Sequence, residues 1–302
     1  MIVALAGAAG LASFGLVLAG ACALAWAGLD AVRKRLSAVV LPLPLLALLN
    51  ICLIPVFATW WIVAGGTITD FEAYVVPASL ALVLQIVANI LFLAALRASP
   101  LSMTIPFLGL TPAFATLGGL VVLGEQPTTA QLLGVGLVVV GALVLGSAPS
   151  AEGERVGLLR AFVRERGAIM MCGVALCWAV TMSLDKRALA HAAVPIHALV
   201  DLVGVLVAVL IVLAVRGRLA ELRVERSAWA LLGLAGLIFA AAFALQLLVI
   251  QVVEIAVVET IKRAVGLVSA VVLGKWLFGE DVGPLTWVAV ALIGVGVVAV
   301  ML

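Results

Sequence analysis

Long apolar runs separated by short polar breaks dominate this sequence. A helix needs about 20 consecutive apolar residues to cross the hydrocarbon layer of a bilayer. Runs of about that length predict ten helices, at residues 4–28, 38–64, 75–97, 101–123, 129–148, 167–187, 195–215, 228–250, 255–278 and 284–301. The pattern therefore predicts an all-α polytopic membrane protein, because a chain in lipid must satisfy its backbone polar groups within each helix.

Composition supports this class and excludes others. The 302 residues are 66% hydrophobic and 11% charged, against about a quarter charged in a soluble domain. The net charge of +2 is too small to indicate nucleic-acid binding. Two histidines, with no HExxH, Walker-type or paired CxxC pattern, give no case for an enzyme, a metal or a cofactor. The four cysteines lie in apolar runs and are interpreted as small buried hydrophobes.

The chain contains an internal repeat. Leu123-Gly124-Glu125 and the following GVGLVVVG align without gaps, at an offset of 155, with Phe278-Gly279-Glu280 and AVALIGVG. Trp26 followed by Lys34-Arg35 matches Trp178 followed by Lys186-Arg187 at an offset of 152. The sequence thus predicts one five-helix repeat at 1–148, a connecting loop at 149–166 and a second repeat at 167–302. An odd number of spans per repeat inverts the second copy, which is typical of secondary transporters.

Basic residues lie mainly in alternate loops. The first, third, fifth and seventh loops hold twelve Lys and Arg, and the even loops hold only Lys186 and Arg187. By the positive-inside rule the odd loops face the cytoplasm and both termini lie outside.

The five-plus-five layout, the Gly-Glu that ends a helix in each half, and the stretch ALRASPLSMTIPFLGLTPAFATLGGLVVLGE resemble the drug/metabolite transporter superfamily, specifically its EamA-type ten-helix carriers. The resemblance covers essentially the whole chain. It implies a multi-pass protein of the bacterial plasma membrane, with a central cavity lined by the first, third, fourth, sixth, eighth and ninth helices. It also implies both termini in the cytoplasm, contrary to the charge rule, and a fifth and tenth helix at the periphery. Their glycines fit a homodimer interface or close packing within one chain equally well.

The ninth predicted helix carries three charges in a segment otherwise apolar enough to span a bilayer. Glu259, Lys262 and Arg263 are spaced i, i+3 and i+4, so the carboxylate can reach both cations. A self-neutralised cluster that only orients the helix is one interpretation. Two cations against one anion, however, leave a surplus positive charge that favours an anionic ligand.

The Lys262-Arg263 pair followed by AVGLVSAVV is also similar to the ninth helix of triose-phosphate and phosphate translocators. That resemblance implies that the pair holds a substrate phosphate. It further suggests a basic partner on the sixth helix, for which Lys186 is the candidate, although Lys186 at a helix end is equally typical of an interfacial anchor.

Other polar residues in apolar runs are candidate substrate ligands or coupling groups. Gln85, Asn89 and Gln246 either line the cavity or bond neighbouring helices, and Trp178 either flanks the pathway or anchors the interface. Asp201, with His197 nearby, and Glu254 are candidates for coupling, with helix capping as the alternative for Asp201. Pro106 and Pro112 predict an irregular fourth helix, and Gly266 stands where the repeat would place the same irregularity in the second half.

These features predict a secondary transporter that moves a small, anionic, phosphate- or carboxylate-bearing metabolite by alternating access. Two alternatives remain: an EamA-type exporter of amino acids, in which a zwitterion binds Glu259 and Arg263 together, and a flippase or binder of a lipid-linked phosphate. The expected partners are the substrate and membrane lipid, with no nucleic acid.

Overall fold

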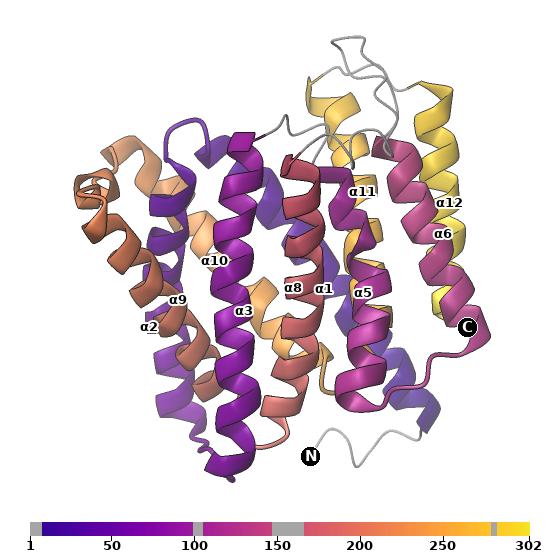
Figure 1. The fold of residues 1–302 in the computed structure, drawn as a ribbon, viewed down its shortest axis with the longest axis horizontal. Coiled ribbons are helices and arrows are strands. Elements are labelled where there is room, and N and C mark those ends of the chain that lie inside the picture. Colours follow the sequence, from indigo (N-terminus) through magenta and orange to yellow (C-terminus); the bar gives the residue numbers. More distant parts are fainter. Residues whose placement is uncertain (1–7, 99–104, 147–165, 279–282) are drawn as a thin grey trace. The chain divides into compact units, whose positions relative to one another are not determined.

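The computed structural model describes residues 8–98, 105–146, 166–278 and 283–302 (Figure 1). The described residues form ten α-helices and no named strand: α1 (Ala8–Leu36), α2 (Pro42–Ala64), α3 (Phe71–Ala98), α5 (Thr111–Gly118), α6 (Thr129–Gly146), α8 (Arg166–Leu189), α9 (Val194–Val215), α10 (Trp229–Val249), α11 (Ile255–Phe278) and α12 (Pro284–Val300). The predicted connecting loop, apart from Arg166, and the second Gly-Glu motif at Gly279-Glu280 lie outside the described residues.

The all-helical prediction is confirmed for the described part of the chain. Six described helical segments are long and apolar enough to cross a membrane: Ser13–Arg33, Pro42–Ala64, Phe71–Phe92, Arg166–Leu189, Val194–Val215 and Arg226–Val249. Three shorter apolar segments follow the same pattern, at Phe107–Leu123, Thr129–Leu145 and Pro284–Val300. The chain is therefore a multi-pass membrane protein, and a total of ten spans stays a prediction.

The fourth predicted helix is not one α-helix. It consists of a 3-10 turn, η1 (Ile105–Leu110), then α5, then a π-helical turn, η2 (Gly119–Leu123). Pro112 lies in the first turn of α5, where its missing N–H costs least. In contrast, α11 runs unbroken through Gly266, so the irregularity considered for that position is absent. The difference is physical, because Pro removes a backbone donor and Gly does not.

The described helices divide between two compact units. Unit 1 comprises residues 1–86 and 184–252, and unit 2 comprises 87–183 and 253–302. The division falls within α3 and α8, so each of these helices contributes one part to each unit. Each unit thus takes helices from both halves of the sequence.

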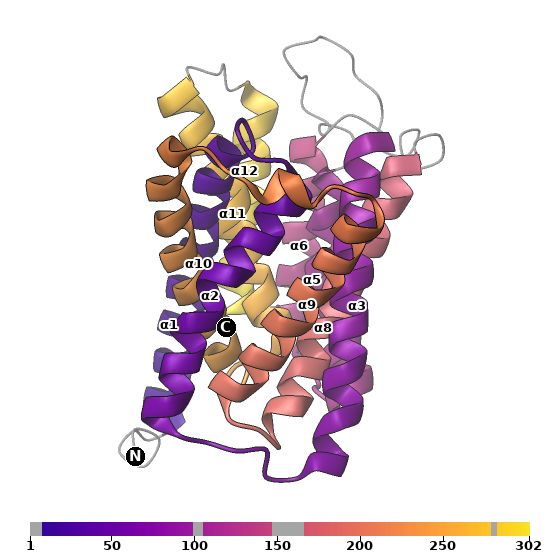
Figure 2. The same cartoon turned by 90° about the vertical axis from the view of Figure 1, so that its left-hand side faces the viewer.

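Unit 1 is held together by close helix packing between distant parts of the chain. Here α1 packs on α10, and α2 packs on both α9 and α10 (Figure 2). The thiol of Cys22 in α1 lies 3.8 Å from the carbonyl oxygen of Ala242 in α10. Cys22 is buried, as the interpretation of the cysteines as small buried hydrophobes requires, whereas Cys52, Cys172 and Cys177 are only partly buried. None of the four forms a disulfide.

In unit 2, α6 and α12 pack closely and run side by side (Figure 1). A Cβ placed on Gly134 would lie 2.6 Å from the carbonyl oxygen of Gly296, and one on Gly296 would lie 2.8 Å from that of Gly134. Only glycine allows the two backbones to approach so closely. These two glycines of the predicted peripheral helices are therefore used for packing within one chain.

We expect Gly134→Ala to destabilise the protein, because its new methyl group would overlap the Gly296 carbonyl. Overpacking of this kind costs about 1 to 3 kcal/mol. Gly136→Ala is the matched control, since a Cβ there meets no described atom within 4 Å and alanine favours a helix. The melting temperature of each purified variant in detergent checks this. Equal melting temperatures for the two variants would contradict the close approach of α6 and α12.

Candidate functional site

The start of α11 is fixed by a carboxylate from the other half of the sequence. Gly124 takes a left-handed backbone conformation, with φ of 71°, directly after the π-helical turn. Glu125 follows it, and its Oε2 accepts a hydrogen bond from the backbone N–H of Ile255 at 3.2 Å. A negative charge at a helix N-terminus is stabilised by the helix dipole. The Gly-Glu motif of the first half therefore positions the helix that carries the charged residues.

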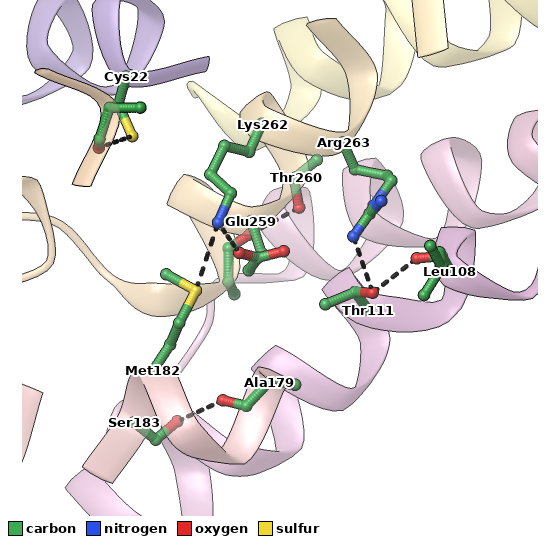
Figure 3. Close-up of polar contacts among 12 residues, drawn as sticks. Cys22, Leu108, Thr111, Ala179, Met182, Ser183, Glu259, Thr260, Lys262 and Arg263 are labelled. Carbon is green, nitrogen blue, oxygen red and sulfur yellow. Dashed lines mark hydrogen bonds and ion pairs between the residues drawn. The ribbon is translucent and has the colours of Figure 1, made fainter. Parts of the chain in front are cut away.

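Glu259 and Lys262 form an ion pair one turn apart on α11 (Figure 3). Lys262 Nζ lies 2.5 Å from Glu259 Oε1, and Glu259 is only 2% exposed. Lys262 Nζ also lies 3.7 Å from the sulfur of Met182 in α8. The buried carboxylate is thus neutralised by its neighbour, as the cost of an unpaired charge at such a position requires.

Arg263 has a different partner. Its Nη2 donates to the hydroxyl oxygen of Thr111 at 3.1 Å (Figure 3). Thr111 in turn donates to the carbonyl oxygen of Leu108 at 2.6 Å. In a regular helix that carbonyl would receive the N–H of the residue at position 112, which is proline and has none. Pro112 thereby frees the carbonyl that fixes the Thr111 hydroxyl, and this leaves an oxygen lone pair for Arg263.

The charge balance of the site follows from these contacts. The spacing allows Glu259 to reach both cations, but the structure pairs it with Lys262 alone. Among the described residues, Arg263 has a neutral hydroxyl as its partner and no carboxylate within 4.0 Å. Its Nε is buried and makes no hydrogen bond in that part of the chain. Of the two cations, Arg263 therefore has no counterion among the described residues, and its Nε–H is an unused donor there.

Two further predicted ligands and one predicted coupling residue belong to unit 2. Asn89 lies in α3 and is partly buried. Trp178 packs in an apolar cluster, with its ring centroid 5.8 Å from that of Phe92. Glu254 precedes α11, and its carbonyl oxygen accepts from Val258 N–H at 3.1 Å, which makes it the N-cap residue. The substrate role of Asn89 and Trp178, and the coupling role of Glu254, stay predictions.

The remaining predicted residues belong to unit 1. Gln85 lies in α3, Lys186 in α8, Asp201 in α9 and Gln246 in α10. Gln246 is 9% exposed, whereas Gln85, Lys186 and Asp201 are partly exposed. Their roles also stay predictions.

Sequence reasoning missed two partners of the site. Met182 was not singled out, because a methionine in an apolar run carries no signal of its own. Thr111, which adjoins Pro112 in the sequence, is the hydrogen-bond partner of Arg263, 152 residues away. The neighbouring Pro112 is the sequence feature that points to it. No group of three or more His, Cys, Asp or Glu side chains suited to a metal ion occurs among the described residues.

Removing Lys262 should destabilise the protein, because it leaves the buried Glu259 carboxylate without a cation. We expect Lys262→Met to cost about 3 to 5 kcal/mol and to lower the melting temperature in detergent. The double variant Glu259→Gln/Lys262→Met should recover most of the loss, since no charge is then left unpaired. A single variant as stable as the wild type would contradict the ion pair.

Comparisons with known proteins agree with the fold. The family model of the EamA-like transporter family matches residues 13–147 and again residues 165–302. A search of curated proteins found no match. A solved structure, described as the crystal structure of a protein, matches with a TM-score of 0.75 at 19% sequence identity. That match covers 95% of this chain and 96% of the other, and at this identity it shows a shared fold alone.

The two matched regions together cover most of the sequence, one in each half, as the internal repeat predicts. The chain belongs to the EamA-like transporter family.

Proposed function

We propose that this transporter carries a small anionic metabolite and that Arg263 binds its negatively charged group. The observation that carries the proposal is the absence of a carboxylate within ion-pair distance of Arg263 in the described residues, while Lys262 is occupied by Glu259. A guanidinium offers planar, paired donors that match a carboxylate or a phosphate. The free Nε donor and the Nη2 donor held by Thr111 lie on one guanidinium.

The charge of the site favours one negative charge on the bound group over a zwitterion. An amino acid would need a carboxylate for its ammonium group, and Glu259 already contacts Lys262 at 2.5 Å. Displacing Lys262 would leave its ammonium unpaired in a segment where unpaired charge is costly. We therefore rank amino-acid export below transport of an anion. The similarity of Lys262-Arg263 to the translocators of phosphorylated compounds points in the same direction.

We further propose transport by alternating access between two inverted five-helix repeats, in the bacterial plasma membrane. Support comes from the two separate family matches, one per half, and from the internal repeat of the sequence. In inverted-repeat carriers the substrate site lies near irregular backbone at mid-membrane depth. The 3-10 and π-helical turns that flank α5 are irregular backbone of this kind, and α5 supplies the hydroxyl that contacts Arg263.

A thermal-shift screen tests the anion proposal. The probes are phosphoenolpyruvate, 3-phosphoglycerate, succinate, leucine and spermidine, added to the purified full chain in detergent. A true ligand stabilises by mass action, by about 2.7 kcal/mol at a concentration of 100 times its Kd. We expect at least one of the three anions to raise the melting temperature, and neither leucine nor spermidine to do so.

The same screen on two variants tests whether the anion stabilises the protein through Arg263. Arg263→Gln should abolish the stabilisation by the anion, because it removes the one of the two site cations on α11 that has no carboxylate partner among the described residues. Lys275→Gln is the matched control: it removes the same charge from the same helix at an exposed position, where Nζ lies 5.4 Å from the ring centroid of Trp287. Stabilisation that survives Arg263→Gln, or that leucine alone produces, would refute the proposal.

Uptake into proteoliposomes then separates transport from lipid handling. A soluble anion that stabilises the protein should accumulate in the lumen and should exchange with unlabelled anion inside. The flippase alternative predicts no accumulation, because a lipid-linked phosphate only changes leaflet.

A further inference from the structure

Unit 1 contains a buried row of hydrogen-bonded titratable side chains, none of which belongs to the anion site. The Tyr74 hydroxyl lies 3.1 Å from His197 Nδ1, and His197 Nε2 lies 3.3 Å from Asp185 Oδ1. Tyr74 and His197 are 3% exposed, and Asp185 is 7% exposed. The three residues come from α3, α9 and α8, so only the folded unit brings them together.

Backbone hydrogen bonds join the two loops that precede α3 and α9, the helices that carry Tyr74 and His197. Ile68 and Ala192 form an isolated antiparallel bridge between the α2–α3 and α8–α9 loops. Thr69 N–H donates to His191 carbonyl oxygen at 2.8 Å, and Ala193 N–H donates to Thr67 carbonyl oxygen at 3.2 Å. The bridge fixes the starts of α3 and α9, and with them Tyr74 and His197. By the positive-inside rule both loops face away from the cytoplasm.

Asp201 adds a second carboxylate one turn along α9. It interacts electrostatically with both Asp185 and His197 and makes no hydrogen bond or ion pair with any described residue. For Asp185, His197 is the only ion-pair partner within 4.0 Å in the described part of the chain. One imidazole thus lies 3.3 Å from one carboxylate and one helical turn from a second, and no described lysine or arginine forms an ion pair with either carboxylate.

Other charged groups at the start of α3 and around the end of α8 are more exposed than Asp185 and His197. Asp70 and Glu72 at the start of α3 are exposed, as is Arg187 in α8, while Lys186 and His191 are partly exposed. Of the elements packed against α9 in unit 1, α2 and α10 contain no Asp, Glu, His, Lys, Arg or Tyr. The 3-10 turn η3 (Leu219–Leu222) carries Glu221, which pairs with Arg218. Nothing on α2 or α10 neutralises the carboxylates.

We propose that Asp185, His197 and Asp201, with Tyr74, form a proton-binding site. With both carboxylates ionised and the imidazole neutral, the cluster carries two negative charges in apolar surroundings, which is costly. Hydronium gives its proton to a carboxylate oxygen or to the imidazole, forming an O–H or N–H bond and releasing water. Each proton removes one negative charge. A role of this site in coupling proton movement to transport rests on the proposed function, whereas proton binding itself does not.

The direction of the hydrogen bond between Tyr74 and His197 depends on the protonation of His197 Nδ1. When Nδ1 is unprotonated, the Tyr74 hydroxyl donates to it; when Nδ1 carries a proton, Nδ1 donates to the Tyr74 oxygen. The change requires only rotation of the hydroxyl at the observed distance of 3.1 Å. The chain has one tyrosine and two histidines, so both partners of this hydrogen bond can be observed individually.

NMR of the full chain in detergent, labelled with ¹⁵N-histidine and ¹³C-tyrosine, tests the proposal. In a His191→Gln background the single imidazole is His197. We expect its resonances and that of Tyr74 to change together as the pH is lowered, because the two side chains share one hydrogen bond. Asp201→Asn and Asp185→Asn should each move the midpoint about one pH unit lower, because a neighbouring negative charge favours the imidazolium.

Asp70→Asn is the control, since it removes an exposed carboxylate that caps α3 through Ala73 N–H at 3.1 Å. It should leave the midpoint in place. His197 and Tyr74 signals that stay constant over the pH range would overturn the proposal, as would a midpoint that neither Asp201→Asn nor Asp185→Asn moves. The measurement uses no substrate, so its failure is distinct from failure of the anion proposal.

Discussion

Neutralisation of charge in an apolar helix is the constraint on which the site depends. The N-terminal half of α11 carries one carboxylate and two cations, and desolvation penalises each of them unless it finds a partner. Glu259 takes Lys262, and Arg263 takes a hydroxyl that carries no charge. The resulting imbalance of one positive charge among the described residues of the site is the physical basis for proposing an anionic substrate.

Irregular backbone around α5 positions two hydrogen-bond acceptors for α11. Pro112 frees the Leu108 carbonyl, which orients the Thr111 hydroxyl toward Arg263. Beyond α5, the π-helical turn and the left-handed Gly124 bring the Glu125 carboxylate to the first N–H of α11. A π-helical turn of this kind is rare and occurs often at functional sites. Both contacts join the fourth predicted helix to the ninth, so the two halves of the sequence build the site together.

The sequence predicted where the helices and the charged site residues lie, but not which side chains those residues contact. Apolar runs define helices by length alone, and the structure places helices at all ten predicted positions. Spacing showed that Glu259 could reach either cation, but the choice of Lys262 depends on Thr111, which is distant in sequence. Likewise His197 and Asp201 were visible as polar residues, whereas Tyr74 and Asp185 join them only because three helices meet. The positions of the helices follow from the local apolar pattern, whereas the hydrogen-bond and ion-pair partners of a side chain follow from tertiary packing.

Anomalous diffraction from crystals soaked in selenate shows most directly whether Arg263 binds an anion. Selenate resembles phosphate in shape and charge, and selenium locates it without ambiguity. We expect an anomalous peak within hydrogen-bond distance of Arg263 Nε in the wild type and none there in Arg263→Gln. Selenate bound only at the arginines of the loops, with the Arg263 guanidinium unoccupied, would contradict it.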